Sequence, residues 1–225
     1  MDATKPPLTI SSEAYRKAGV GFERFEELAE ALNAKKPVFR SYVDLVIQHS
    51  TPPRSYHTLD GHVSHLLSEY DNLQTPANNP AALQASIWLH DAVYNPTRED
   101  NEERSAQYAQ QLLSSLEVDA RVQEQTKQLI LATKHHLPAT HDQQLLCDLD
   151  LTILGQEKAV YDTYKEQVRE EHAFVEPEVY SQKRAEVLQE FLNKPRIYHT
   201  QELRGAYEKK ARKNVEQEIN ELLIQ

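Results

Sequence analysis

The sequence predicts an all-α protein whose residues 1–225 form a single domain. Only 5 of the 225 residues are glycine, 27% are charged, and no stretch alternates valine or isoleucine with polar residues as a strand would. Apolar residues recur instead at helical spacing along most of the chain. We expect residues 1–11 to be a loose leader, residues 38–155 to form the core, and residues 156–224 to add C-terminal helices.

Several helix starts can be assigned to particular residues. Asn79 is a good N-cap, and Pro80 suits the first helical position because its missing N–H is not needed there. Asp100 and Glu103 resemble the two ends of a capping box, and Asp119 can cap the next helix. These signals and the apolar spacing predict helices at about residues 12–34, 37–47, 62–73, 80–90, 101–116, 119–137, 141–154, 156–174, 177–192 and 200–223.

Charge and composition indicate a cytoplasmic protein that acts on a small molecule. The net charge of −10 argues against an extended nucleic-acid surface. No apolar run approaches the roughly 18 residues that a membrane span needs, and the first residues lack a signal-peptide pattern. The single Cys147 permits no internal disulfide, which fits a reducing compartment. The long final helix could pack on the protein's own core or pair with a second copy in a homodimer.

His90 and Asp91 lie side by side at the end of an apolar helix. Neighbouring side chains on a helix point about 100° apart, so the two can share a metal ion only if it lies in the wedge between them. Imidazole nitrogen and carboxylate oxygen together suit Mn, Fe, Co, Ni or Zn. Alternatively, Asp91 caps the helix and His90 is a hydrogen-bonded core histidine. Taken alone, the pair favours this simpler interpretation.

More histidines occur before and after this pair. Of His57, His62 and His65, we expect one to bind metal, one to act near the substrate and one to be structural. His135 and His136 follow a lysine at the predicted end of another helix. They are candidates for chemistry, but they could equally complement the negative C-terminal end of that helix.

Asp148 and Asp150 are embedded among leucines. A buried carboxylate is costly unless it is paired, protonated or bound to a metal, so at least one of them must have a partner. The two lie about 200° apart on a helix. We therefore expect only one to face the core and the other to be solvated or to lie behind the ligands.

The order of these donors resembles the HD-domain superfamily of metal-dependent phosphohydrolases, and most closely a branch of predicted bacterial phosphohydrolases. The order is a histidine, then a His-Asp pair, then a distant aspartate on successive helices. The matching motifs span roughly residues 54–200 and are Tyr56 to Val63, Ile87 to Tyr94, Asn101-Glu102, Asp148 to Gly155 and Arg196 to Tyr198.

The resemblance implies an HD-type helical bundle whose metal ligands are His62, His90, Asp91 and Asp150. Asp148 is the alternative to Asp150. Cyclic-nucleotide phosphodiesterases have a similar histidine pair, in which the earlier histidine protonates the leaving oxygen, and this implies a catalytic role for His57. One additional residue, apparently Gly61, separates the two histidines here. Asp91 is a second catalytic candidate as a proton acceptor, and Arg54 and Lys134 are candidates for phosphate contacts.

The resulting leading hypothesis is an enzyme, a phosphomonoesterase or phosphodiesterase that hydrolyses a small phosphate ester such as a nucleotide with Mn, Co, Ni, Mg, Fe or Zn. A second hypothesis is a di-iron oxygenase of the HD type, in which His135 or His136 would help to hold a second metal. A third is a helical binding protein whose metal is structural. The open coordination expected of two imidazoles and two carboxylates favours catalysis over the third hypothesis.

Overall fold

A computed structural model describes residues 20–224, which form ten α-helices and contain no β-strand. The all-α prediction is therefore confirmed, while the expected leader at residues 1–11 and the start of the first predicted helix lie outside the described residues. The helices are α2 (Phe22–Ala31), α3 (Phe39–His49), α4 (Ser64–Asp71), α5 (Pro80–Leu89), α6 (Asn101–Ser115), α7 (Ala120–Thr133), α8 (His141–Asp150), α9 (Lys158–Glu171), α10 (Pro177–Asn193) and α11 (Gln201–Leu223).

Two short helical segments differ from the predictions, and both lie beside candidate ligands. The turn before α4 is a π-helix, η1 (Leu59–Val63). The single helix predicted at residues 141–154 is divided, because α8 ends at Asp150 and a 3₁₀ helix, η2 (Thr152–Gly155), follows it.

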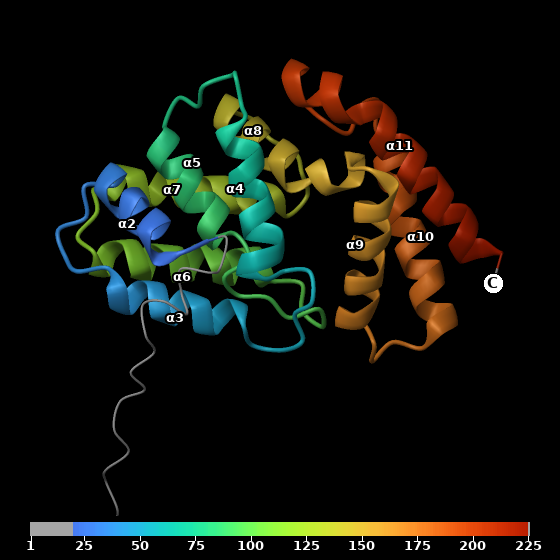
Figure 1. Cartoon of the computed structure of the whole chain (residues 1–225), viewed down its shortest axis with the longest axis horizontal. Helices are drawn as coiled ribbons and strands as arrows, with labels where there is room; N and C mark the ends of the chain where they lie inside the picture. The colour runs from blue at the N-terminus through green and yellow to red at the C-terminus, as the bar shows by residue number, and fades with distance from the viewer. Residues whose placement is uncertain (1–19, 225) are drawn as a thin grey trace, which may run out of the picture.

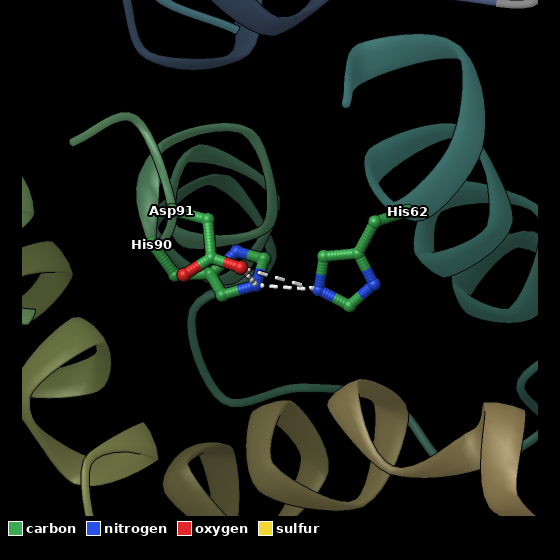
Figure 2. Close-up of side chains that lie close together, drawn as sticks. All are labelled: His62, His90 and Asp91. Carbon is green, nitrogen blue, oxygen red and sulfur yellow. Dashed lines mark hydrogen bonds and ion pairs between the residues drawn. The ribbon is translucent and has the colours of Figure 1, made fainter. Parts of the chain in front are cut away.

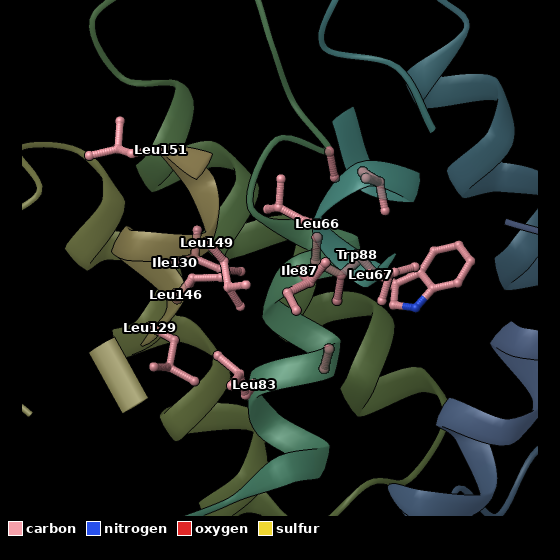
Figure 3. Packing of buried hydrophobic residues seen from close by; sticks show 14 of the residues in the cluster. Leu66, Leu67, Leu83, Ile87, Trp88, Leu129, Ile130, Leu146, Leu149 and Leu151 are labelled. Carbon is pink, nitrogen blue, oxygen red and sulfur yellow. The ribbon is translucent and has the colours of Figure 1, made fainter. Parts of the chain in front are cut away.

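Helix α5 lies at the centre of the larger group of helices (Figure 1). It is apolar on every side, as expected for a helix surrounded by others, and it contacts α2, α4, α6, α7 and α8. Its buried side chains pack with leucines and isoleucines of these neighbours (Figure 3). Trp88 is fully buried, and its ring meets Phe25 edge to face at 5.3 Å. This packing fixes the C-terminal end of α5, where His90 and Asp91 lie.

Helices α9, α10 and α11 lie together on one side of that group (Figure 1). Helix α11 packs against α10 and η2, and its Leu203, Ala211 and Val215 are buried. The long final helix therefore packs on the protein's own core, which was one of its two expected arrangements. Among the helices of residues 20–224, none is both long and apolar enough to cross a membrane.

Candidate metal centre

The π-helix η1 accommodates the additional residue between His57 and His62. The Val63 amide donates to the Thr58 carbonyl at 3.2 Å, which is the i to i+5 bond of a π turn. The Gly61 amide donates to Thr58 Oγ1 at 3.0 Å, and a Cβ on Gly61 would lie only 2.8 Å from that oxygen. A larger residue at this position would crowd the Thr58 hydroxyl, and His62 itself is buried.

His90 is oriented by the last turn of α5. Its Nδ1 lies 3.1 Å from the Ile87 carbonyl oxygen. Because a carbonyl oxygen only accepts hydrogen bonds, Nδ1 carries a proton, and Nε2 offers a lone pair whenever the ring is neutral. Asp91 follows directly, and its carbonyl accepts a hydrogen bond of 2.8 Å from Arg54.

Four side chains from three separate segments converge at the end of α5. His62 Nε2 lies 2.9 Å from His90 Nε2. Asp91 Oδ2 lies 3.3 Å from His90 Nε2 and 3.5 Å from His62 Nε2 (Figure 2). Asp150 Oδ1, at the end of α8, lies 3.0 Å from His62 Nε2 and 3.5 Å from His90 Nε2. The structure thus brings together the four residues that the resemblance implies as ligands.

The spacing and chemistry of these donors fit one divalent cation. Ligand atoms about 2.1 Å from a cation lie about 3.0 Å apart at right angles and about 3.4 Å apart in a tetrahedron. The nitrogen–nitrogen and nitrogen–oxygen distances here run from 2.9 to 3.5 Å. His62, His90 and Asp91 each offer a ligand atom within 4.8 Å of the others. Two imidazoles and two carboxylates also balance the charge of a divalent ion.

The carboxylates form the accessible side of this centre. The side chains of His62 and His90 are 2% and 1% exposed, whereas those of Asp91 and Asp150 are 17% and 15% exposed. Burial by itself would raise the pKa of each carboxyl, but the neighbouring histidines lower both well below their usual range. Both carboxylates are therefore ionised at neutral pH.

Asp148 has a different partner and is fully buried. Its two oxygens accept hydrogen bonds of 2.7 Å from the His199 amide, the Thr200 amide and the Thr200 hydroxyl. The expectation that only one aspartate of α8 faces the protein interior is wrong. The segment before α11 covers Asp148, which lies on the face of α8 opposite Asp150. Asp148 thus anchors that segment, while Asp150 lies at the centre.

His57 forms an ion pair with Glu171, the last residue of α9. Its Nδ1 lies 2.6 Å from Glu171 Oε2, and its ring stacks on Tyr94 with 4.2 Å between the ring centroids. Burial would lower the pKa of His57, but the hydrogen bond to Glu171 and the charge of Asp91 raise it above its ordinary value. The side chain of His57 is 21% exposed.

The remaining candidate histidines occupy three different environments. His65 Nε2 lies 2.9 Å from the Thr152 hydroxyl, which ties α4 to η2. His136 Nε2 lies 2.9 Å from Asp150 Oδ2, the carboxylate oxygen that faces away from His62. The side chain of His135 is exposed. Of the two adjacent histidines, only His136 therefore reaches the centre, through Asp150.

The two basic candidates for phosphate contacts are engaged by other groups. Arg54 donates to the carbonyls of His57, Asp91 and Ala92 at 2.6, 2.8 and 3.0 Å, so it joins the segment before η1 to the end of α5. Lys134 pairs with Glu103 and donates to the Glu99 carbonyl. Phosphate contacts by these two residues stay a prediction.

Three residues of this region had been given no role from the sequence. Tyr56 places its hydroxyl 2.9 Å from His62 Nδ1, and Glu171 binds His57. His49, at the end of α3, is buried, and neither ring nitrogen has a partner among residues 20–224. Burial and the nearby Arg54 lower the pKa of His49 to about 3, so its ring is neutral. No local sequence signal distinguishes His49 or Glu171 from surface residues.

Comparisons of the chain with protein-family models, with curated proteins and with solved structures found no match. The fold and the site define an all-helical protein with two histidines and two aspartates gathered at the buried end of its central helix. Any functional assignment therefore rests on the chemistry of these side chains.

Proposed function

We infer that this protein is a metal-dependent phosphohydrolase with an HD-type helical fold, which cleaves a phosphate ester of a small molecule such as a nucleotide. The observation that carries the proposal is the convergence of His62, His90, Asp91 and Asp150 from η1, α5 and α8. Burying this many ionisable groups together is costly without a ligand that they share. Their donor atoms suit Mn, Co, Ni, Mg, Fe or Zn.

Such a cation lowers the pKa of a bound water towards about 7 and offsets the charge of the phosphoryl oxygens. The protein supplies the side chains that orient it. Tyr56 fixes the ring of His62 through Nδ1, and the Ile87 carbonyl fixes the ring of His90. Both Nε2 atoms are thereby directed to the same point, which is the arrangement expected around a bound metal.

His57 is the proposed general acid. In the reaction, a water oxygen forms a bond to phosphorus, the ester P–O bond breaks, and the leaving oxygen takes a proton from His57 Nε2. Asp91 accepts the proton lost by the water, so the products are an alcohol and a phosphate. Glu171 favours the protonated form of His57, and its carboxylate binds Nδ1, so the proton that is transferred is the one on Nε2.

The test combines metal analysis with a phosphatase screen. We expect about one divalent metal per chain and cation-dependent release of phosphate from small phosphate esters. His90→Ala and Asp91→Ala should each reduce the rate by about 10³-fold or more, because the metal's contribution is lost. The exposed His135→Ala serves as the matched control and should retain activity.

Three other outcomes would overturn this proposal. Phosphatase activity that survives both His90→Ala and Asp91→Ala would exclude the mechanism. Two tightly held irons per chain, oxygen consumption and no phosphate release would identify an oxygenase instead. A cation that raises the melting temperature without supporting hydrolysis would indicate a structural metal.

A further inference from the structure

A cavity with basic walls lies next to the candidate metal centre. We call it the basic pocket, and its volume is about 530 Å³, within the range typical of small-molecule sites. Among residues 20–224, no acidic side chain lines it. Its basic lining residues are His136, Lys194, Arg196, His199 and Arg204.

Lysine and arginine side chains contribute three cations to the basic pocket. Within residues 20–224, no carboxylate oxygen lies within 4.0 Å of the charged nitrogens of Lys194, Arg196 or Arg204. By contrast, Arg212 on the same helix as Arg204 pairs with Glu208 at 2.7 Å. Like charges gathered in one cavity repel each other, and the chain as a whole carries a net charge of −10. This local excess of positive charge favours an anionic ligand.

The backbone that carries Arg196 is fixed before any ligand binds. The amides of Ile197 and Tyr198 donate to Glu208, and the next two amides donate to Asp148. Ile197 and Tyr198 are buried, whereas Arg196 is exposed. A basic side chain on a fixed segment loses less conformational freedom on binding than one on a mobile loop. The pocket is therefore preorganised.

The basic pocket is joined to the metal centre by His136. Its Nε2 contacts Asp150 Oδ2, while Oδ1 of the same carboxylate faces His62 and His90. His136 has a φ of 49°, which is a left-handed backbone conformation. Glycine adopts this conformation with less strain than histidine does. The Phe191 ring contacts both His136 and Lys194, with centroid distances of 6.1 and 5.0 Å.

We propose that the basic pocket binds a phosphate group of the substrate other than the one that is hydrolysed. The substrate is then a small molecule with at least two phosphate groups, one at the metal centre and one held by Arg196, Arg204 and Lys194. Arginine and lysine bind phosphate through charge-assisted hydrogen bonds. The assignment of the substrate rests on the proposed hydrolase activity, whereas phosphate binding by the pocket does not.

The first experiment measures pyrophosphate binding by calorimetry to the full chain treated with a chelator, so that no metal takes part. We expect one binding site, weakened as the salt concentration rises. The double variant Arg196→Gln/Arg204→Gln should bind at least about tenfold more weakly, because two charge-assisted contacts are lost. The control, Lys209→Gln/Lys213→Gln, removes the same charge from exposed positions of α11 and should bind as the unmodified protein does.

A second measurement tests the substrate class with the active cation present. The Arg196→Gln/Arg204→Gln variant should raise the KM for a nucleoside 3′,5′-bisphosphate about tenfold or more and leave the KM for p-nitrophenyl phosphate unchanged. Equal KM changes for both substrates would overturn the assignment of the substrate. Pyrophosphate binding that is unchanged in Arg196→Gln/Arg204→Gln, or equally weakened in the control variant, would overturn the proposal that the basic pocket binds phosphate. Pyrophosphate binding as expected in a protein without phosphatase activity would leave the pocket standing and refute the hydrolase.

Discussion

Glu171 lies 114 residues after His57 in the sequence, and its Oε2 lies 2.6 Å from His57 Nδ1. Its other oxygen accepts the backbone amides of Ser55, Tyr56 and His57 at 2.8 to 2.9 Å. One carboxylate at the end of α9 thus holds both the backbone and the imidazole of the segment before η1. Through this contact the C-terminal helices position the proposed general acid.

The first prediction concerns the pH dependence of stability. Burial would raise the pKa of Glu171, but His57 and the backbone amides lower it from 4.5 to about 2. A carboxyl group whose pKa is lower in the folded protein stabilises the fold. This stabilisation is fully present when the pH is above the pKa of the unfolded state, and it is lost as the pH falls through the pKa of the folded state. Glu171→Gln should therefore reduce the free energy of unfolding by about 3 kcal/mol at pH 7, and the difference should shrink between pH 4.5 and about 2.

Denaturant titrations of both proteins across this pH range measure the effect. Glu170→Gln is the matched control, because its side chain is exposed and its hydrogen bond is to the Ser55 hydroxyl. It should change the free energy of unfolding by less than about 0.5 kcal/mol. A difference between Glu171→Gln and the unmodified protein that stays constant down to pH 2 would contradict this account.

The second prediction concerns the support of His62. The buried Tyr56 hydroxyl lies 2.9 Å from His62 Nδ1, so Tyr56→Phe removes this contact and keeps the packing of the ring. At the proposed metal centre, loss of such a contact should weaken cation affinity by about 10- to 100-fold. Competition with a chromophoric chelator measures this affinity. Tyr94→Phe loses a hydroxyl that contacts Glu171 rather than a ligand, and should leave the affinity unchanged.

The helices could be predicted because their signals are local. Asn79 accepts the Ala82 amide and Asp119 accepts the Arg121 amide, as their sequence positions indicate. The capping box expected at Asp100 is wrong, because that carboxylate binds Arg98 instead. A true capping box occurs at Thr140, before α8. Short polar side chains can take several neighbouring partners, and the sequence does not say which of them is chosen.

The site could be predicted only in part, for a physical reason. His90 and Asp91 follow an apolar helix, and this local pattern places them at its buried end. The contacts of Glu171 and Asp148 join segments far apart in the chain, so they depend on how the helices pack. The same holds for the basic pocket, where His136 and Arg204 meet only after α7, α10 and α11 have assembled.

The third prediction separates the two aspartates of α8. Asp148→Asn places an amide group against one of the donors at His199 or Thr200, which should reduce the free energy of unfolding by about 2 kcal/mol. Its effect on cation affinity should be small. Asp150→Asn should instead abolish cation binding, because it removes a proposed ligand carboxylate. Thermal melts with and without added cation would measure both quantities, and equal loss of cation stabilisation in the two variants would contradict the assignment.

The fourth prediction compares two glycines: Gly155, which packs against α11, and Gly205, which is part of α11. A Cβ added to Gly155 would lie 2.6 Å from Tyr207 Cβ and 2.9 Å from the Tyr207 carbonyl oxygen, and the backbone of a long helix cannot easily move away. Gly155→Ala should therefore destabilise the protein by about 2 kcal/mol or more, since η2 must separate from α11. Gly205 lies in α11 with no atom within 4 Å of an added Cβ, so Gly205→Ala should stabilise the helix by about 0.5 to 1 kcal/mol. Urea unfolding of both variants tests the packing of α11 directly, because equal stability of the two would mean that Gly155 and Tyr207 are not in contact.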